Sequence, residues 1–355
     1  MASVTQPPET EDLVGDERVA QIGIVRRTLV RPEIGALIGA IAVFVFFSIA
    51  ARPDFATVAG AARFLDPTST LGIMAVAVAL LMIGGEFDLS AGAITGSTGL
   101  IAGMLAVEVG WNLWLSMAVA LAFALLIGFI NGTLVMRTGL PSFIITLATF
   151  FILRGVNVGV TRLVTDEVRV TGVDDLAGFE TLRAIFNHEF TFLDQTFRTT
   201  IIWWIVITVI ASWVLLRARF GNWIFAVGGD FNAARSVGVP AVRTKIALFM
   251  YVSFSGWLVG MMQMARLRGT VASEGVGQEF VFIIAAVIGG NLLTGGYGSV
   301  IGASLGALIF GMTRTGITFA GWDTDWFFAF LGAMLLLAVF VNEYTRRYAQ
   351  EVGSR

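Results

Sequence analysis

The residues LRARFGNWIFAVGGDFNAARSVGVPAVRTK, Leu216 to Lys245, form a polar and basic interruption between two strongly apolar runs, 199–217 and 245–266. Each run is long enough to cross a hydrocarbon core of about 30 Å as a helix, which rises about 1.5 Å per residue. The strict polar–apolar alternation of barrel strands is absent. The pattern therefore predicts a chain that leaves the bilayer between two transmembrane helices.

A short helix is predicted inside this interruption. Asn232, Ala233, Ala234 and Arg235 are followed by Gly238, so that the order is x-Ala-Ala-x-x-x-Gly. Glycine readily adopts the left-handed conformation that ends a helix. The stretch therefore predicts a small helix that is held outside the membrane.

Composition defines the broad class of the protein. The 355 residues are 56% hydrophobic and 14% charged, and the mean hydropathy is +0.82. Ordinary soluble domains are less apolar and more charged, so the chain is predicted to be an integral membrane protein. Cysteine is absent and His188 is the single histidine, so we predict no metal site, no cofactor and no catalytic residue. The net charge of −2 argues against a nucleic-acid partner.

The apolar runs predict an all-α, polytopic bundle of about ten transmembrane spans. The expected spans are 34–51, 68–85, 90–108, 112–136, 139–160, 199–217, 245–266, 280–293, 300–320 and 326–342. The weakest of them is 280–293, which is short for a full crossing and is alternatively a re-entrant half-helix.

Charge asymmetry predicts how the chain is oriented. Residues 1–33 are a polar tail with arginines just before the first span, which places the N-terminus in the cytoplasm. Ten spans within a permease domain, 34–345, return the C-terminal tail, 346–355, to the same side, together with the loop 217–245. The acid-rich segment 161–198 then lies outside, either as a solvated cap or as part of a docking surface for an external partner.

Two glycine-rich breaks resemble each other and predict a possible internal repeat. They read GGEFDLSAG over 84–92 and GGNLLTGGYGS over 289–299. Each precedes a span in which glycines recur four residues apart, as in Gly92 and Gly96 or Gly302 and Gly306. That spacing places the glycines on one helix face, where a neighbouring backbone can approach closely.

The charged groups near these breaks are predicted to be structural. Glu86 and Asp88 follow the end of an apolar run, and the surrounding glycines favour a turn at the membrane edge. Asp88 precedes a span and fits a helix N-cap, with ion or proton coupling as the alternative. Arg314, near the end of its span, is interpreted as reaching the interface.

Polar side chains inside or beside the spans are candidates for a translocation path. They are Asn131, Thr146, Asn157 and Asn291. Such side chains either line a hydrated path or bond neighbouring helices, and the sequence leaves both interpretations open.

Active transport would need an outside source of energy. Lys245, the one lysine, is preceded by Arg243-Thr244 and followed by Ile246, which does not fit the phosphate-binding loop Gly-x-x-x-x-Gly-Lys-Ser/Thr. Two hypotheses follow: a permease driven by a separate ATPase that contacts 217–245, or an ion-coupled carrier or channel for a small polar solute.

Three stretches resemble the membrane permeases of bacterial ATP-binding-cassette importers for simple sugars, of the ribose and xylose type. The stretch 84–92 is similar to that family's Gly-Gly-Ile-Asp-Leu-Ser-Val-Gly segment, with Glu86 as a departure. A second lies in Ile130-Asn131-Gly132, Leu140–Leu147 and Arg154-Gly155, and a third in Arg219–Gly238. The resemblance runs from about Leu71 to Val341.

The resemblance implies a core of two permease chains, identical or related, with ATPase subunits on the cytoplasmic side. It also implies a periplasmic binding protein that delivers a monosaccharide, a pentose or a hexose, across the inner membrane. The segment Asn232, Ala233, Ala234, Arg235 to Gly238 looks like the family's coupling helix, Glu-Ala-Ala-x-x-x-Gly, which enters a cleft on the ATPase. Asn232 stands where glutamate is usual.

Overall fold

The computed structural model describes residues 32–51 and 53–353, so almost all of the predicted N-terminal tail lies outside the described residues. In chain order the elements are α2 Pro32–Ala50, η1 Pro53–Ala56, α3 Val58–Ile83, α4 Ala91–Val107, α5 Leu113–Thr138, α6 Ser142–Thr165, β1 Arg169–Val170, η2 Val173–Asp175, α7 Phe179–Phe186, β2 Glu189–Phe192, β3 Gln195–Arg198, α8 Thr199–Arg217, α9 Arg219–Gly229, α10 Phe231–Ser236, α11 Ala241–Leu267, β4 Thr270–Val271, α12 Gln278–Ile288, α13 Val300–Phe319 and α14 Trp326–Gly353.

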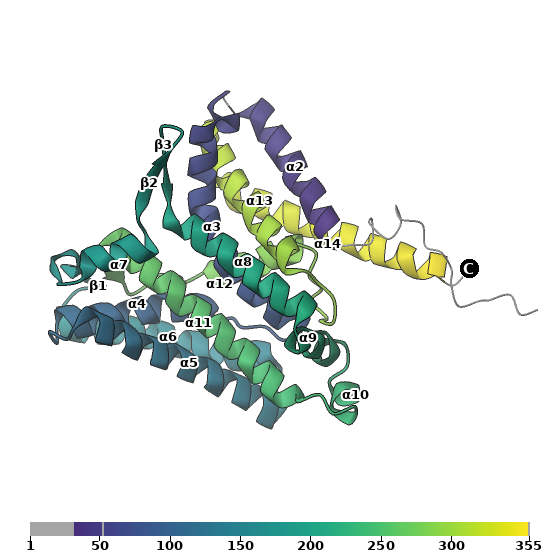
Figure 1. Ribbon diagram of the computed structural model, residues 1–355, viewed down its shortest axis with the longest axis horizontal. Helices are drawn as coiled ribbons and strands as arrows, with labels where there is room; N and C mark the ends of the chain where they lie inside the picture. The colour runs from purple at the N-terminus through teal and green to yellow at the C-terminus, as the bar shows by residue number, and fades with distance from the viewer. Residues whose placement is uncertain (1–31, 52, 354–355) are drawn as a thin grey trace, which may run out of the picture.

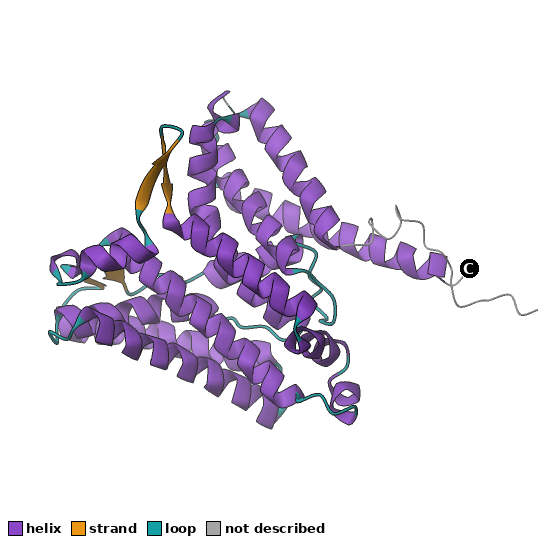
Figure 2. Ribbon diagram, in the orientation of Figure 1, coloured by secondary structure: helices purple, strands orange, loops and turns teal. Residues whose placement is uncertain are grey.

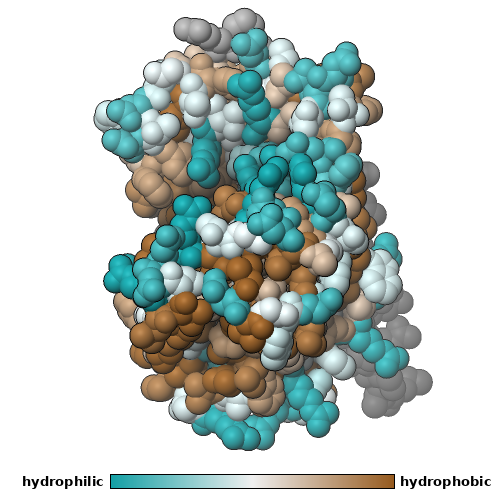
Figure 3. Space-filling model, turned by 90° about the vertical axis from the view of Figure 1, so that its left-hand side faces the viewer, coloured by the Kyte–Doolittle hydropathy of each residue, from teal (hydrophilic) through white to brown (hydrophobic). Residues whose placement is uncertain are grey.

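The predicted all-α, polytopic bundle is confirmed (Figures 1 and 2). Each of the ten predicted spans coincides with a helix. Seven of the described helices are long and apolar enough to cross a membrane, and three shorter apolar helices, Ala91–Val107, Gln278–Ile288 and Trp326–Phe340, occupy the other predicted spans. On the face shown in Figure 3, hydrophobic side chains gather in a broad area bordered by hydrophilic ones, as expected where lipid meets a helical bundle.

The bundle has two ends that can be recognised from short elements. The antiparallel hairpin of β2 and β3 marks one, which we call the hairpin end, and α10 marks the other, the α10 end (Figure 1). Helix α3 connects them: near its start Asp66 contacts Arg198 of β3, and at its finish the carbonyl oxygen of Ile83 accepts the N–H of Gly296 at 2.8 Å.

Helix α3 is the centre of the molecule. Within its most apolar window 78% of residues are buried, against 22% for α6 and 17% for α2. It packs against α13, α8, α11 and α12, whereas α2 and α6 present apolar side chains to the outside. The uniformly apolar sequence of α3 from Leu71 to Ile83 is therefore explained by neighbours on all sides.

The eighth predicted span coincides with a short helix that follows a run of turns, 272–277. β4 pairs with β1, after which the chain passes the glycine face of α4, where Gly96 and Gly92 abut Glu274 and Gly275. Helix α12 continues from Gln278 to Gly289, which packs on Gly302 of α13. The four-residue glycine spacing predicts these close approaches. The predicted span 280–293 thus contains an 11-residue helix, Gln278–Ile288, followed by a loop, and the full crossing and the re-entrant half-helix both stay predictions.

Two predicted boundaries are corrected by the structure. Helix α3 begins at Val58, ten residues before the predicted start, and includes Pro67. Pro67 has no backbone N–H, so one hydrogen bond of the helix is not made. Pro67 lies beside a polar cavity that Arg63 and Asp66 also line. The predicted loop 217–245 is mostly helical, since it contains α9, α10 and the start of α11.

Candidate functional site

Helix α10 is a short helix with a cap at each end. Asp230 precedes it, and its Oδ1 accepts the N–H of Ala233 at 2.9 Å, so Asp230 is the N-cap. Gly238 has φ +87°, its N–H donates to Arg235, and the next N–H, of Val239, donates to Ala234. The left-handed glycine predicted from the sequence is thus present, and it closes the helix in a Schellman arrangement.

Most of α10 is exposed, and one residue anchors it. Ala234 is buried in a small cluster with Val227 of α9 and Ala241 of α11. Asn232, Ala233, Arg235 and Gly238 are exposed. Val237 is 79% exposed, which leaves an apolar side chain at the tip. Of the two adjacent alanines, Ala233 therefore belongs to the outer surface and Ala234 to the internal packing.

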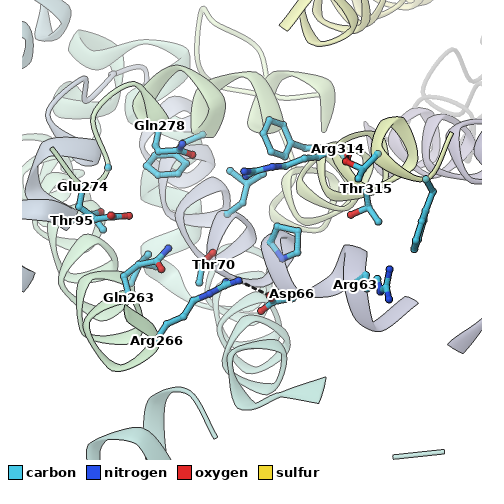
Figure 4. Close-up of a pocket in the computed structure, with 18 residues that line it drawn as sticks. Arg63, Asp66, Thr70, Thr95, Gln263, Arg266, Glu274, Gln278, Arg314 and Thr315 are labelled. Atoms are coloured by element: carbon cyan, nitrogen blue, oxygen red, sulfur yellow. Dashed lines mark hydrogen bonds and ion pairs between the residues drawn. The ribbon is translucent and has the colours of Figure 1, made fainter. Parts of the chain in front are cut away.

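A polar cavity lies toward the hairpin end, at the opposite pole from α10. Its volume is about 560 Å³. The walls are the first turns of α3, the last turns of α11 and α13, and the start of α12, together with Thr95 of α4 and the turns at Glu274 and Gly275 (Figure 4). Its polar and charged lining residues are Arg63, Asp66, Thr70, Thr95, Gln263, Arg266, Glu274, Gln278, Arg314, Thr315 and Thr318.

Ion pairs hold two of the charged residues that line this cavity, Asp66 and Arg266. Asp66 accepts from Arg266 Nη2 at 2.9 Å and lies 3.5 Å from Arg198 Nε. The Arg63 guanidinium lies 5.2 Å from the centroid of the Phe319 ring. Figure 4 shows Arg266 directed at Asp66 and Arg314 extending from α13 toward the middle of the space. Arg314 therefore lies in the wall of the cavity with an exposed side chain, and its interpretation as an interface residue stays a prediction.

The four predicted path residues are held by hydrogen bonds within the protein. Asn131 Nδ2 donates to Ser90 Oγ at 3.0 Å, and Thr146 Oγ1 accepts the N–H of Leu89 at 3.0 Å. Asn157 Oδ1 accepts from Ser97 of α4, and Asn291 donates to the carbonyl oxygen of Ala286 in α12 and accepts the N–H of Ser299 before α13. The structure brings Asn131 and Thr146 together at the turn 84–90, and none of the four is among the residues that line the cavity.

The turn 84–90 is packed within the protein at the α10 end of the bundle, and its position at a membrane edge stays a prediction. Asp88 is fully buried, and its Oδ1 accepts the N–H and the hydroxyl of Ser90 at 2.8 and 2.5 Å. Helix α4 starts at Ala91 with Ser90 in the N-cap position, where the Ser90 side chain makes no capping bond; Asp88 lies two residues before the assigned cap and, as predicted, accepts a backbone N–H at the start of the helix. Glu86 is also buried. A polar turn at this depth needs internal partners, because lipid offers none.

Most of the residues that line the cavity are not predicted from the sequence. Arg63 and Asp66 fell before the predicted start of their span, and Gln263, Arg266 and Glu274 come from elements about 200 residues away. A local signal existed in the charge pair Arg63 and Asp66 close to Pro67, since charged residues beside a span tend to line polar paths.

Long apolar helices, polar backbone segments buried between them and a polar cavity together define a multi-pass helical membrane protein of the permease class. Residues 60–339 match the family model described as branched-chain amino acid transport system / permease component, and the chain belongs to this family. It is a multi-pass protein of the inner membrane.

Several relatives are similar over most of their length. The xylose transport system permease protein of Escherichia coli (strain K12) is 30% identical, over 86% of this chain and 90% of that protein. The ribose import permease protein of the same organism is 31% identical, over 82% and 87%. The fructose import permease protein of Rhizobium meliloti is 29% identical, over 80% and 78%. No solved structure matches.

Proposed function

We propose that this chain is the permease subunit of an ATP-binding-cassette importer, and that it forms the translocation path for a monosaccharide, a pentose or a hexose. The observation that carries the proposal is the placement of an exposed, doubly capped α10 at one end of the bundle and a polar cavity toward the other. Permeases named for xylose, ribose and fructose are similar over most of the chain, which supports a sugar as cargo.

The α10 end is proposed to face the cytoplasm. Arg137, Arg217, Arg219, Arg235 and Arg243 stand at helix ends there, whereas the segment 161–198 at the hairpin end is rich in acids. Basic residues beside spans favour the cytoplasmic side. Both termini, the tails 1–33 and 346–355, would then be cytoplasmic, with the permease domain 34–345 between them.

Three partners complete the proposed transporter. An ATPase subunit would contact Asn232, Ala233, Arg235 and Gly238 on α10, with Ala234 as the anchor that holds the helix to the bundle. A periplasmic sugar-binding protein would dock at the hairpin end, and a second permease chain, identical or related, would complete the membrane core. This chain would supply no catalytic group, metal or cofactor.

The cavity suits a neutral, hydroxyl-rich cargo. Its volume lies within the roughly 300–1,000 Å³ of small-molecule sites. Threonine hydroxyls and glutamine amides can both donate to and accept from sugar hydroxyls, and the paired charges of Asp66 and Arg266 offer further fixed partners. Asn131, Thr146, Asn157 and Asn291 are proposed to hold the buried turns beside this path.

Transport would proceed by alternating access. ATP binding on the partner subunits would move α10, and the bundle would open the path to one side and then the other. Binding of the sugar can shift this equilibrium only as far as its affinity differs between the two states.

Reconstitution tests the proposal against the ion-coupled alternative. The chain would be placed in liposomes with the ATPase and the binding protein encoded beside it, and uptake of radiolabelled xylose, ribose and fructose would be measured. The proposal predicts uptake of one of these sugars that requires ATP and both partners. Uptake by the chain alone, driven by a proton or sodium gradient, would contradict it and favour a carrier.

A further inference from the structure

Three turns from distant parts of the chain meet at the α10 end, with glycine at each contact. We call this the glycine junction; it comprises 84–85 at the end of α3, 228–229 at the end of α9 and 295–296 in the loop before α13. A methyl group on Gly228 would overlap the carbonyl oxygen of Ile83, and one on Gly295 would lie 2.7 Å from Gly85 Cα. The backbones are therefore in direct contact, with no room for side chains between them.

A buried ion pair bridges the same place. Lys245 Nζ, on the first turns of α11, contacts Glu86 Oε1 at 2.5 Å. Lys245 is 6% exposed and Glu86 is 8% exposed. The ammonium also lies 5.2 Å from the centroid of the Phe231 ring, and Phe231 is the first residue of α10. One lysine thus connects α10 to the turn that follows α3.

The other side of this turn is held by α5 and α6. The N–H groups of Phe87 and Leu89 donate to the hydroxyls of Ser142 and Thr146, and Asn131 donates to Ser90. The turn 84–90 is therefore fixed between the α10 side and the α5–α6 side. Its upstream helix, α3, carries Arg63, Asp66 and Thr70 of the cavity wall at its far end.

The glycine junction and the ion pair resist different movements. Backbone atoms in contact resist being pushed together, but their dispersion attraction is weak for each pair of atoms. A buried ion pair resists separation, because each charge would otherwise be left unpaired in a low-dielectric environment. The ion pair therefore resists separation of the turn from α11, in addition to the hydrogen bond from the N–H of Gly296 to Ile83, and through Phe231 it also links the turn to α10.

We propose that the Glu86–Lys245 pair is the positioning contact that transmits movement of α10 to α3 and so to the cavity. The inference rests on the proposed function, in which a partner ATPase moves α10. Glu86 and Lys245 would touch neither cargo nor nucleotide; they would determine how much transport each ATP hydrolysed produces.

The test is a double variant, Glu86→Gln with Lys245→Met, in the reconstituted transporter with its ATPase and binding protein. Both charges are removed, so no buried charge is left unpaired and the protein should insert and assemble with the ATPase at the wild-type yield. Sugar uptake per ATP hydrolysed should fall at least tenfold. Arg137→Gln, which removes one exposed charge at the same end of the bundle, is the matched control and should retain wild-type coupling.

A second variant gives an independent measurement if the double variant assembles poorly. Phe231→Leu removes the ring beside Lys245 and leaves both buried charges in place. Uptake per ATP hydrolysed should fall about two- to fivefold, the scale of one cation–π contact, while Phe231→Tyr should retain it.

Two outcomes would overturn the inference. Wild-type coupling in the double variant, or in Phe231→Leu if only that variant assembles, would show that these contacts serve folding alone. Absence of ATP-driven uptake in the unmodified complex would refute the proposed function, and the inference with it. The two failures are distinguished by the unmodified complex.

Discussion

The two ends of this bundle are built in opposite ways. At the α10 end, backbone packs directly on backbone through glycine, and a single buried ion pair bridges the turns. Toward the hairpin end, long charged and polar side chains surround about 560 Å³ of space. The first arrangement has almost no freedom to rearrange, whereas the second can exchange partners with water or a solute. The difference suggests that the α10 end conveys movement and the cavity responds to it.

The tight backbone packing at the α10 end is tested most directly at Gly228. We expect Gly228→Ala to have the largest effect, because the added methyl meets the backbone of Ile83 and Gly296, which cannot move aside as a side chain can. Overpacking of this kind lowers the free energy of unfolding by about 1–3 kcal/mol. The measurement is the yield and melting temperature of the purified protein in detergent.

Gly229→Ala is the matched control for this prediction. No described atom lies within 4 Å of the position that its Cβ would take, and alanine favours helix over glycine by up to about 1 kcal/mol. We therefore expect wild-type or higher stability. Equal losses in both variants would show that the backbone contact at Gly228 is not what makes this end rigid.

The cavity should respond to charge with less effect on folding. Asp66→Asn leaves Arg266 and Arg198 without their shared carboxylate, so the geometry of the cavity wall changes. Because these groups are partly exposed, we expect the loss of the ion pairs to cost on the order of 1 kcal/mol of free energy. This cost corresponds to about a fivefold fall in sugar uptake at low sugar concentration. Asp54→Asn, outside the cavity, is the control. An unchanged uptake rate for Asp66→Asn would remove Asp66 from the path.

The sequence predicts the elements better than it predicts the sites. The order of the apolar helices follows from apolar length, because lipid requires about 20 apolar residues per helix; seven of the described helices reach the length of a span and three are shorter. The helix at 232–238 was predicted from its glycine, although its N-cap, Asp230, was missed.

The sequence does not show how deeply a polar residue is buried, or which residues distant in sequence contact it. Glu86 resembles a surface turn residue, because its partner, Lys245, lies 159 residues away and is recognised only in the folded chain; the partner of Asp88, Ser90, is local, but the burial of Asp88 is not visible in the sequence. Similarly, Asp66 and Arg266 are 200 residues apart in sequence, and nothing local to either predicts the contact. The possible internal repeat stays a prediction, although both breaks end a helix with the same positive-φ glycine, Gly85 and Gly290.

The smallest expected difference in unfolding free energy between two variants concerns two buried asparagines. Asn131 bonds Ser90 and accepts from Thr149 at 2.7 Å, whereas Asn157 Nδ2 has no hydrogen-bond partner among the described residues. Asn131→Leu should cost about 1–3 kcal/mol of unfolding free energy because it leaves buried groups unpaired, and Asn157→Leu should cost less. Melting temperatures in detergent compare the two, and the reverse order would count against the turn 84–90 as a fixed point.

The most direct test of the account measures access to each end of the bundle in turn. The chain has no cysteine, so Thr70→Cys in the cavity and Arg235→Cys on α10 can each be labelled alone with a thiol reagent that does not cross membranes. We predict that Arg235→Cys reacts only from the cytoplasmic side and is protected by the ATPase subunit, and that the labelling rate of Thr70→Cys from the periplasmic side changes when ATP is bound. A rate for Thr70→Cys that is independent of ATP, with α10 unprotected, would contradict the claim that movement of α10 controls the cavity.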